Sequence, residues 1–120
     1  MSWTYNQATG ELTKADNVLA CGYAGKGDGK NNPSMEQVPN VGPLPKGLYV
    51  IGSPYDTKTH GPYVLRLTPD PDNEMFDRSG FLIHGDSVSA PGTASEGCII
   101  LPRKIREMIW NSGDNQLQVV

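Results

Sequence analysis

The sequence predicts a mainly β fold, and three observations lead to this prediction. Glycine and proline contribute 14 and 10 of the 120 residues, which favours turns and disfavours long helices. Short stretches of alternating or continuous apolar residues recur along the chain, as strands require. Only the segment 102–112 has apolar residues at helical spacing. The length favours one domain over residues 1–120, with room for one hydrophobic core.

The N-terminal part predicts three strands and a long loop. Residues 3–6 alternate aromatic and polar side chains, and we expect them to form a hairpin with residues 12–14. A third strand is expected over 17–24, with Cys21 inside it. Residues 25–40 are rich in glycine, asparagine and lysine and lack periodicity. They predict a loop that forms one wall of a cleft.

The middle of the chain predicts three more strands. They cover 48–52, 63–68 and 81–84, and we expect the last of these to be the central strand. A polar loop before the second of them contains His60. We interpret this histidine as an ordinary surface residue.

The C-terminal part predicts the helix and a final strand. Pro102 suits a helix start, and Gly113 suits a helix end. The helix over 102–112 is expected to turn an apolar stripe inward and charged residues outward. The stripe consists of Ile105, Met108 and Ile109, and the outward residues are Lys104, Arg106 and Glu107. A last strand is expected over 116–120.

Charge and hydropathy exclude several classes of function. The net charge of −3 disfavours a nucleic-acid groove, because the phosphate backbone requires a basic face. No apolar run approaches the length of about 18 residues that a membrane span needs. The N-terminus shows neither the basic start nor the apolar region of a signal peptide. We therefore expect a protein that stays in the cytoplasm, one that leaves by a route without an N-terminal signal, or a trimmed chain.

Two short segments carry the candidate chemistry. His84 ends the apolar run 81–83, and Cys98 follows Gly97 and leads into the apolar run 99–101. A thiol and an imidazole on neighbouring strand ends have the character of a nucleophile and its base. We expect the imidazole and nearby backbone N–H groups to lower the pKa of the thiol. Taken singly, the cysteine and the histidine would more often be a buried apolar residue and a surface residue.

The residues around this pair suggest supporting roles. Gly97 permits a tight turn that aims N–H groups at one point, as an oxyanion hole requires. A third group must orient the imidazole, and the candidates are Asp86, Ser95 or a backbone carbonyl. The spacing of His84, Asp86 and Cys98 matches no common zinc site, so no metal or cofactor is expected.

At these residues the sequence resembles a known family. The segments Ile83-His84-Gly85 and Ser95-Glu96-Gly97-Cys98-Ile99 resemble the active-site signature of L,D-transpeptidases of the YkuD type. The resemblance is closer to the type VI secretion L,D-transpeptidase effectors. These share a glycine-rich segment at 22–27, a Gly-Pro-x-Pro-x-Gly-x-Tyr segment at 42–49, and Arg78 before the histidine strand.

The resemblance implies a fold and an activity. The fold is a compact L,D-transpeptidase-like β-sandwich or barrel with one short helix after Cys98. The nucleophile is Cys98 and the base is His84. The substrate is the tetrapeptide stem of peptidoglycan, cut between its third residue and the terminal D-alanine. The acyl group passes to water, as in an L,D-carboxypeptidase, or to a D-amino acid or another stem, as in an L,D-transpeptidase.

The resemblance also implies a biological setting. The protein would be an antibacterial toxin that is made in the cytoplasm, secreted without a signal peptide, and active in the periplasm of target bacteria. Its partners would be peptidoglycan stem peptides, a cognate immunity protein and the secretion machinery. Nucleic acid and membrane insertion are not implied.

Two positions depart from the family pattern. Glu96 replaces the common histidine two residues before the cysteine, and Ile100 replaces the arginine or asparagine two residues after it. We expect Glu96 to face solvent or substrate, because an inward carboxylate would raise the pKa of the thiol. Another arginine could pair with a substrate carboxylate instead, and for each arginine a structural or solvated ion pair is an equally open interpretation. The candidates are Arg78, Arg66 and Arg103. Tyr23 and Glu96 are further candidates for substrate binding, with Tyr23 forming part of the core or the cleft wall.

Two other readings remain open at the level of sequence. A papain-like amidase also uses cysteine and histidine, but its cysteine usually comes first and opens a helix, whereas here His84 precedes Cys98. A cell-wall-binding or inactive toxin-like module would act without catalysis. Stoichiometric labelling of Cys98 by a thiol reagent near neutral pH, with slow labelling of Cys21, would favour an enzyme.

Overall fold

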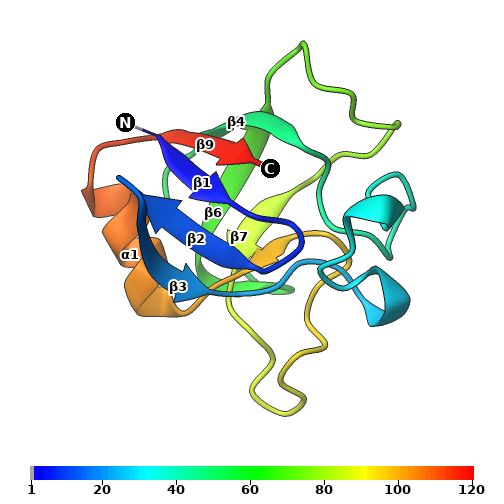
Figure 1. The fold of residues 1–120 in the computed structure, drawn as a ribbon. Coiled ribbons are helices and arrows are strands. Elements are labelled where there is room, and N and C mark those ends of the chain that lie inside the picture. The colour runs from blue at the N-terminus through cyan, green and yellow to red at the C-terminus, as the bar shows by residue number, and fades with distance from the viewer. Residues whose placement is uncertain (1) are drawn as a thin grey trace.

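A curved sheet of nine strands and a single α-helix account for the regular structure of residues 2–120, which the computed structural model describes (Figure 1). The mainly β prediction is confirmed. The strands are β1 (Trp3–Tyr5), β2 (Glu11–Lys14), β3 (Asn17–Cys21), β4 (Gly47–Ile51), β5 (Tyr55–Thr57), β6 (Gly61–Pro69), β7 (Leu82–His84), β8 (Ile99–Ile100) and β9 (Gln116–Val119). The helix is α1 (Arg103–Asn111), and two short 3₁₀ helices are η1 (Gly27–Gly29) and η2 (Pro33–Met35).

The strand order brings distant parts of the chain together. It runs β3-β2-β1-β9-β4-β6-β7-β8, with β5 paired to β6. The pairs β1–β9 and β7–β8 are parallel, and the other strand pairs are antiparallel. Tyr23, just after β3, forms an antiparallel bridge with Ile100 of β8. Because β3 and β8 are the two ends of the strand order, this bridge closes the sheet into a barrel-like shape.

Most of the predicted elements are present, with corrections. The hairpin of β1 and β2 is confirmed, and α1 falls within the predicted range 102–112. The strand β5 was not predicted, because its three residues pair irregularly with β6. The strand β7 is not central, since it lies next to β8 at the end of the strand order.

The inward face of α1 differs from the prediction. Met108 is 46% exposed, and Arg106 is only 4% exposed. Arg106 shares a face with the buried Ile109, because residues three apart are neighbours on a helix. Its guanidinium donates hydrogen bonds to the carbonyls of Leu101 and Pro62, which satisfies part of this buried group.

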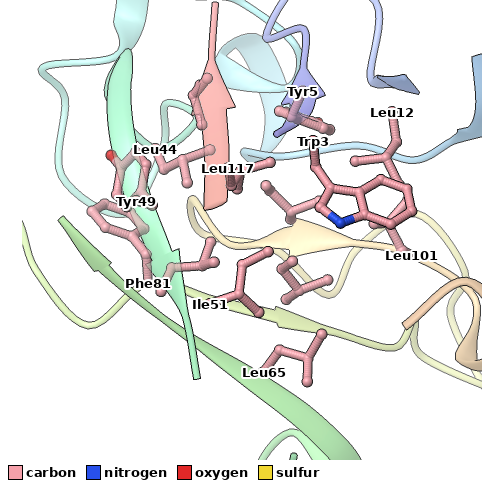
Figure 2. Close-up of a cluster of buried hydrophobic side chains, with 14 of the residues drawn as sticks. Trp3, Tyr5, Leu12, Leu44, Tyr49, Ile51, Leu65, Phe81, Leu101 and Leu117 are labelled. Atoms are coloured by element: carbon pink, nitrogen blue, oxygen red, sulfur yellow. The ribbon is translucent and has the colours of Figure 1, made fainter. Parts of the chain in front are cut away.

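The core lies inside the curved sheet, where strands from both ends of the chain meet. Trp3 of β1 and Leu117 of β9 are each only 1% exposed. Figure 2 shows them in one cluster with residues of the middle strands, such as Ile51 of β4 and Leu65 of β6. Burying an apolar side chain of this size stabilises the fold by roughly 1.5–3 kcal/mol. This core supports β7 and β8, the two strands that carry the candidate site. Within residues 2–120, the one α-helix falls short of the length and apolar character that a membrane span needs.

Candidate active site

The parallel pair β7–β8 places the predicted nucleophile and base on one face. Ile83 pairs with Ile99, and His84 pairs with Ile100. Cys98 lies two residues before Ile100, and side chains two residues apart on a strand point the same way. His84 and Cys98 therefore project from the same side, and both line a cleft of about 900 Å³. The loop 25–40 contributes to this cleft as predicted, through Lys26, Pro39 and Asn40.

A backbone carbonyl orients the imidazole of His84. Its Nδ1 lies 2.9 Å from the carbonyl oxygen of Gly85. A carbonyl oxygen only accepts hydrogen bonds, so Nδ1 carries the proton of the neutral ring and Nε2 remains as the basic nitrogen. Of the three predicted candidates for the orienting group, the structure selects the carbonyl and not Asp86 or Ser95.

The surroundings of His84 keep it neutral at physiological pH. Burial lowers the pKa of His84 below its ordinary value of 6.5, and the hydrogen bond to the Gly85 carbonyl opposes this effect. His60 and Arg106 lower the pKa further, whereas Asp86 raises it slightly. The balance leaves the base form of the imidazole at pH 7.

His60 is more than an ordinary surface residue. Its side chain is exposed, but its ring packs against His84 with the centroids 4.7 Å apart, and it lines the same cleft. The turn between β5 and β6 holds it in place, since its N–H donates to Thr57 Oγ1 at 2.7 Å. Its closeness to His84 arises from the fold, so no local pattern could have predicted it.

The thiol of Cys98 is held by the backbone. Its Sγ accepts a hydrogen bond from the Leu82 N–H at 3.3 Å and lies 4.0 Å from the Gly80 carbonyl oxygen. Burial raises the pKa of Cys98 above its ordinary value. The Leu82 N–H and Arg78 lower the pKa in part, and Glu96 raises it. The predicted lowering of this pKa is therefore wrong, because burial outweighs the nearby positive groups.

Ser95 holds the turn that presents Cys98. Its Oγ donates to the Cys98 carbonyl at 2.6 Å and accepts from the N–H groups of Gly25 and Gly97. Gly97 has a φ of +145°, and a Cβ there would lie 2.6 Å from Nη2 of Arg78. Glycine is therefore required at this position. Ser95 therefore holds the turn that carries Cys98 and does not orient the imidazole of His84. The Gly97 N–H, predicted to face an oxyanion, donates instead to Ser95 Oγ.

Comparison with known families adds an independent observation. The Tlde1 domain model matches residues 19–120. The chain belongs to the Tlde1 domain family. This family comprises type VI secretion effectors, in agreement with the effector branch that the sequence resembles. Searches of the curated proteins and of the solved structures find no match.

The Tlde1 match covers every residue that lines the cleft, from Lys26 to Arg106. It leaves out β1 and β2, although both strands belong to the same sheet. The match identifies an effector domain and does not itself specify a reaction.

In this Tlde1 domain, Asp86 and Tyr23 shape the loop beside the cleft. The Tyr23 hydroxyl donates to Asp86 Oδ1 at 2.6 Å and accepts from the Ala94 N–H at 2.9 Å. Asp86 also accepts from the N–H groups of Ser87 and Gly92. These bonds fold residues 87–94 against Tyr23. Asp86 lines the cleft, whereas Tyr23, which was predicted to bind substrate, does not line it and instead supports the loop through these hydrogen bonds.

The predicted arginines occupy different places. Arg78 is buried and donates to the carbonyls of four residues, Glu36, Gly42, Pro43 and Glu96, so it clamps the cleft wall. Arg66 packs over the Tyr55 ring, and Arg103 pairs with Glu107 at 3.2 Å; neither lines the cleft. Glu96 is exposed and lines the cleft, as predicted.

Sequence reasoning missed Arg106, which lies in the cleft beside His84. The signal was its helical spacing from Ile109, which predicts a shared face. Across residues 2–120, no group of three or more histidine, cysteine and carboxylate side chains is arranged to hold a metal ion. Cys21 and Cys98 are both free thiols, and Cys21 is exposed at the end of β3.

Proposed function

We propose that the protein is a cysteine-dependent peptidoglycan enzyme that acts on tetrapeptide stems as an L,D-carboxypeptidase, an L,D-transpeptidase or both. The observation that carries the proposal is that Cys98 and His84 project from one face of β7–β8 and line the same cleft. The tautomer of His84 supports it, because Nε2 is left as the basic nitrogen in the cleft. Membership of an effector family supports a target outside the producing cell.

Acylation begins from the neutral thiol and the neutral imidazole. His84 Nε2 takes the proton of Cys98, and Sγ attacks the carbonyl carbon of the third stem residue. The tetrahedral intermediate then collapses and breaks the bond to the terminal D-alanine. The protonated imidazole gives its proton to the leaving amine. The products of this step are free D-alanine and a thioester on Cys98.

Deacylation uses the same imidazole as a base. Water, or the amine of a D-amino acid or of another stem, attacks the thioester while His84 takes a proton from it. Sγ leaves as thiolate and recovers that proton from the imidazole. Water yields a tripeptide stem, and an amine yields an exchanged or cross-linked stem. The cleft, with a volume of about 900 Å³, has room for either acceptor.

The neutral resting state suits a toxin that must cross from one cell to another. Burial keeps Cys98 protonated, so the reactive thiolate forms only when His84 is positioned to accept the proton. We propose that the protein is made in the cytoplasm, leaves through the type VI machinery and acts in the target periplasm. An immunity protein in the producer would then protect its own wall. No cofactor takes part in the proposed steps.

A papain-like amidase is less well supported. A papain-type cysteine opens a helix, whereas Cys98 here leads into β8, and α1 begins only at Arg103. A binding module without catalysis would not need the fixed tautomer of His84.

The test is mass spectrometry of tetrapeptide muropeptides incubated with the protein, with and without a D-amino acid. Loss of D-alanine alone indicates a carboxypeptidase, and a mass exchange indicates transpeptidation. We expect Cys98→Ser and His84→Ala to lose activity by about 10²-fold or more. Cys21→Ser is the matched control and should retain activity. Full activity in Cys98→Ser would refute the proposal.

A further inference from the structure

Arg106 is a buried cation without a counterion. Its side chain is 4% exposed and lines the cleft. Nη1 donates to the Leu101 carbonyl at 2.8 Å and Nη2 to the Pro62 carbonyl at 3.4 Å, but the buried Nε has no acceptor. Among residues 2–120, no carboxylate pairs with this guanidinium. Because an unpaired buried charge is costly, its presence in a cleft points to an anionic ligand.

The guanidinium lies directly against the segment that carries the base. A Cβ on Gly85 would lie 2.7 Å from Nη1 of Arg106 and 3.4 Å from Nη2. Glycine after His84 therefore leaves the space that the guanidinium occupies. The positive charge of Arg106 lowers the pKa of His84. The other buried arginine of the cleft, Arg78, is already engaged with four carbonyls.

The chemistry of the leaving group requires a carboxylate near the same imidazole. In the proposed reaction, His84 protonates the amine of the departing C-terminal residue. The amine nitrogen and the carboxylate carbon of an amino acid flank one Cα, so they lie only about 2.5 Å apart. A group that binds this carboxylate must therefore lie next to His84, where the structure has Arg106.

We propose that Arg106 forms a subsite for the free carboxylate of the substrate's leaving C-terminal residue. This inference rests on the proposed function. Arginine suits the role because its planar fork matches a carboxylate. The consequence is an exo-specificity: the enzyme removes one terminal residue and discriminates against stems that are amidated or extended at that end. The proposal also places the residue that binds the substrate carboxylate on α1. In the family that the sequence resembles, an arginine or asparagine is common at the position of Ile100, where this chain has no such group.

The direct test compares two substrates that differ in one group, a tetrapeptide stem ending in D-alanine and the same stem ending in D-alanine amide. We expect the wild-type protein to favour the acid by roughly 10- to 100-fold in kcat/KM, since a charge-assisted hydrogen bond is lost with the amide. Arg106→Gln should reduce turnover of the acid far more than that of the amide. Arg106→Lys should keep part of the preference, and the control Lys104→Gln, on the exposed side of α1, should keep all of it.

Equal turnover of acid and amide by the wild-type protein would overturn the subsite, and so would a preference that survives in folded Arg106→Gln. Thermal melting shows whether each variant is folded. If Arg106→Gln does not fold, the wild-type comparison and Arg106→Lys decide the question.

A second test separates the subsite from the proposed reaction. Iodoacetate carries a carboxylate and iodoacetamide does not, and both alkylate thiols. Relative to iodoacetamide, iodoacetate should alkylate Cys98 several-fold more slowly in Arg106→Gln than in the wild-type protein, whereas the ratio at exposed Cys21 should not change. If no stem is turned over but the Cys98 ratio falls, the proposed function fails and the carboxylate subsite stands. If stems are turned over but the ratio is unchanged and acid and amide are equivalent, the subsite fails and the function stands.

Discussion

The rings of His60 and His84 lie with their centroids 4.7 Å apart and their planes tilted by 55°. One histidine comes from the turn between β5 and β6, and the other ends β7. A positive charge on His60 disfavours protonation of His84, so the two rings share control over the base. The cleft thus contains a second titratable group that touches the candidate base.

Replacement of His60 should shift the pH profile of activity. The pKa of His84 is below 6.5, so the acidic limb of kcat/KM is expected below that pH. His60→Gln removes a group that lowers this pKa, so the limb should move to higher pH while the rate at pH 8 stays similar. Thr59→Val, which removes only the contact to His60 Nδ1, is the control. An unmoved acidic limb in His60→Gln would contradict this account.

Neutralising Glu96 should make the nucleophile more acidic. Glu96 raises the pKa of the Cys98 thiol, so Glu96→Gln should lower it. The midpoint of Cys98 alkylation by iodoacetamide, followed against pH, should move to lower pH. Glu74→Gln, outside the cleft, should leave the midpoint unchanged. In the wild-type protein at pH 7 we expect exposed Cys21 to react at least as fast as Cys98, the reverse of the order suggested by sequence.

Ser95→Ala should destabilise the fold. The hydroxyl serves the N–H groups of Gly25 and Gly97 and the Cys98 carbonyl, and these groups would lose their partner in a buried turn. Leaving such groups unsatisfied costs about 1–3 kcal/mol each, so for three groups a total loss of at least about 3 kcal/mol in the free energy of unfolding is expected. Urea denaturation measures this loss. The exposed Ser89→Ala should change stability by less than about 0.5 kcal/mol, and an equally small effect at Ser95 would show that the turn is held by other contacts.

Arg78→Lys should separate clamping from substrate binding. A lysine has three donors on one nitrogen and does not reproduce the fork that serves four carbonyls. We expect a loss of about 1–3 kcal/mol in stability and an unchanged preference for acid over amide stems. Loss of that preference in a folded variant would assign the carboxylate to Arg78 instead of Arg106.

Local patterns predict most of the elements and single out the candidate pair His84 and Cys98. Alternation and turn residues predict the β1–β2 hairpin, and helical spacing predicts α1. His84 and Cys98 stand out because each adjoins a short apolar strand and a glycine. These features depend on neighbours in sequence, which is why they are visible without the fold.

The remaining features depend on contacts between distant segments. The Cys98 pKa is set by burial, and burial follows from the whole sheet. Arg106 is buried because Gly85, on another element, leaves space for its guanidinium. His60 reaches His84 only because the β5–β6 turn folds over β7. No periodicity within a single segment contains this information.

The parallel pairing of β1 with β9 has a consequence for how the protein folds. The indole N–H of Trp3 donates to the carbonyl of Asp114, 111 positions further along the chain, and β9 lies between β1 and β4 in the sheet. Contacts between residues this far apart in sequence form slowly, because a long segment must be ordered before they can form. We therefore expect β1 to pair with β9 only after β1 and β2, which are near neighbours in the chain, have formed their hairpin.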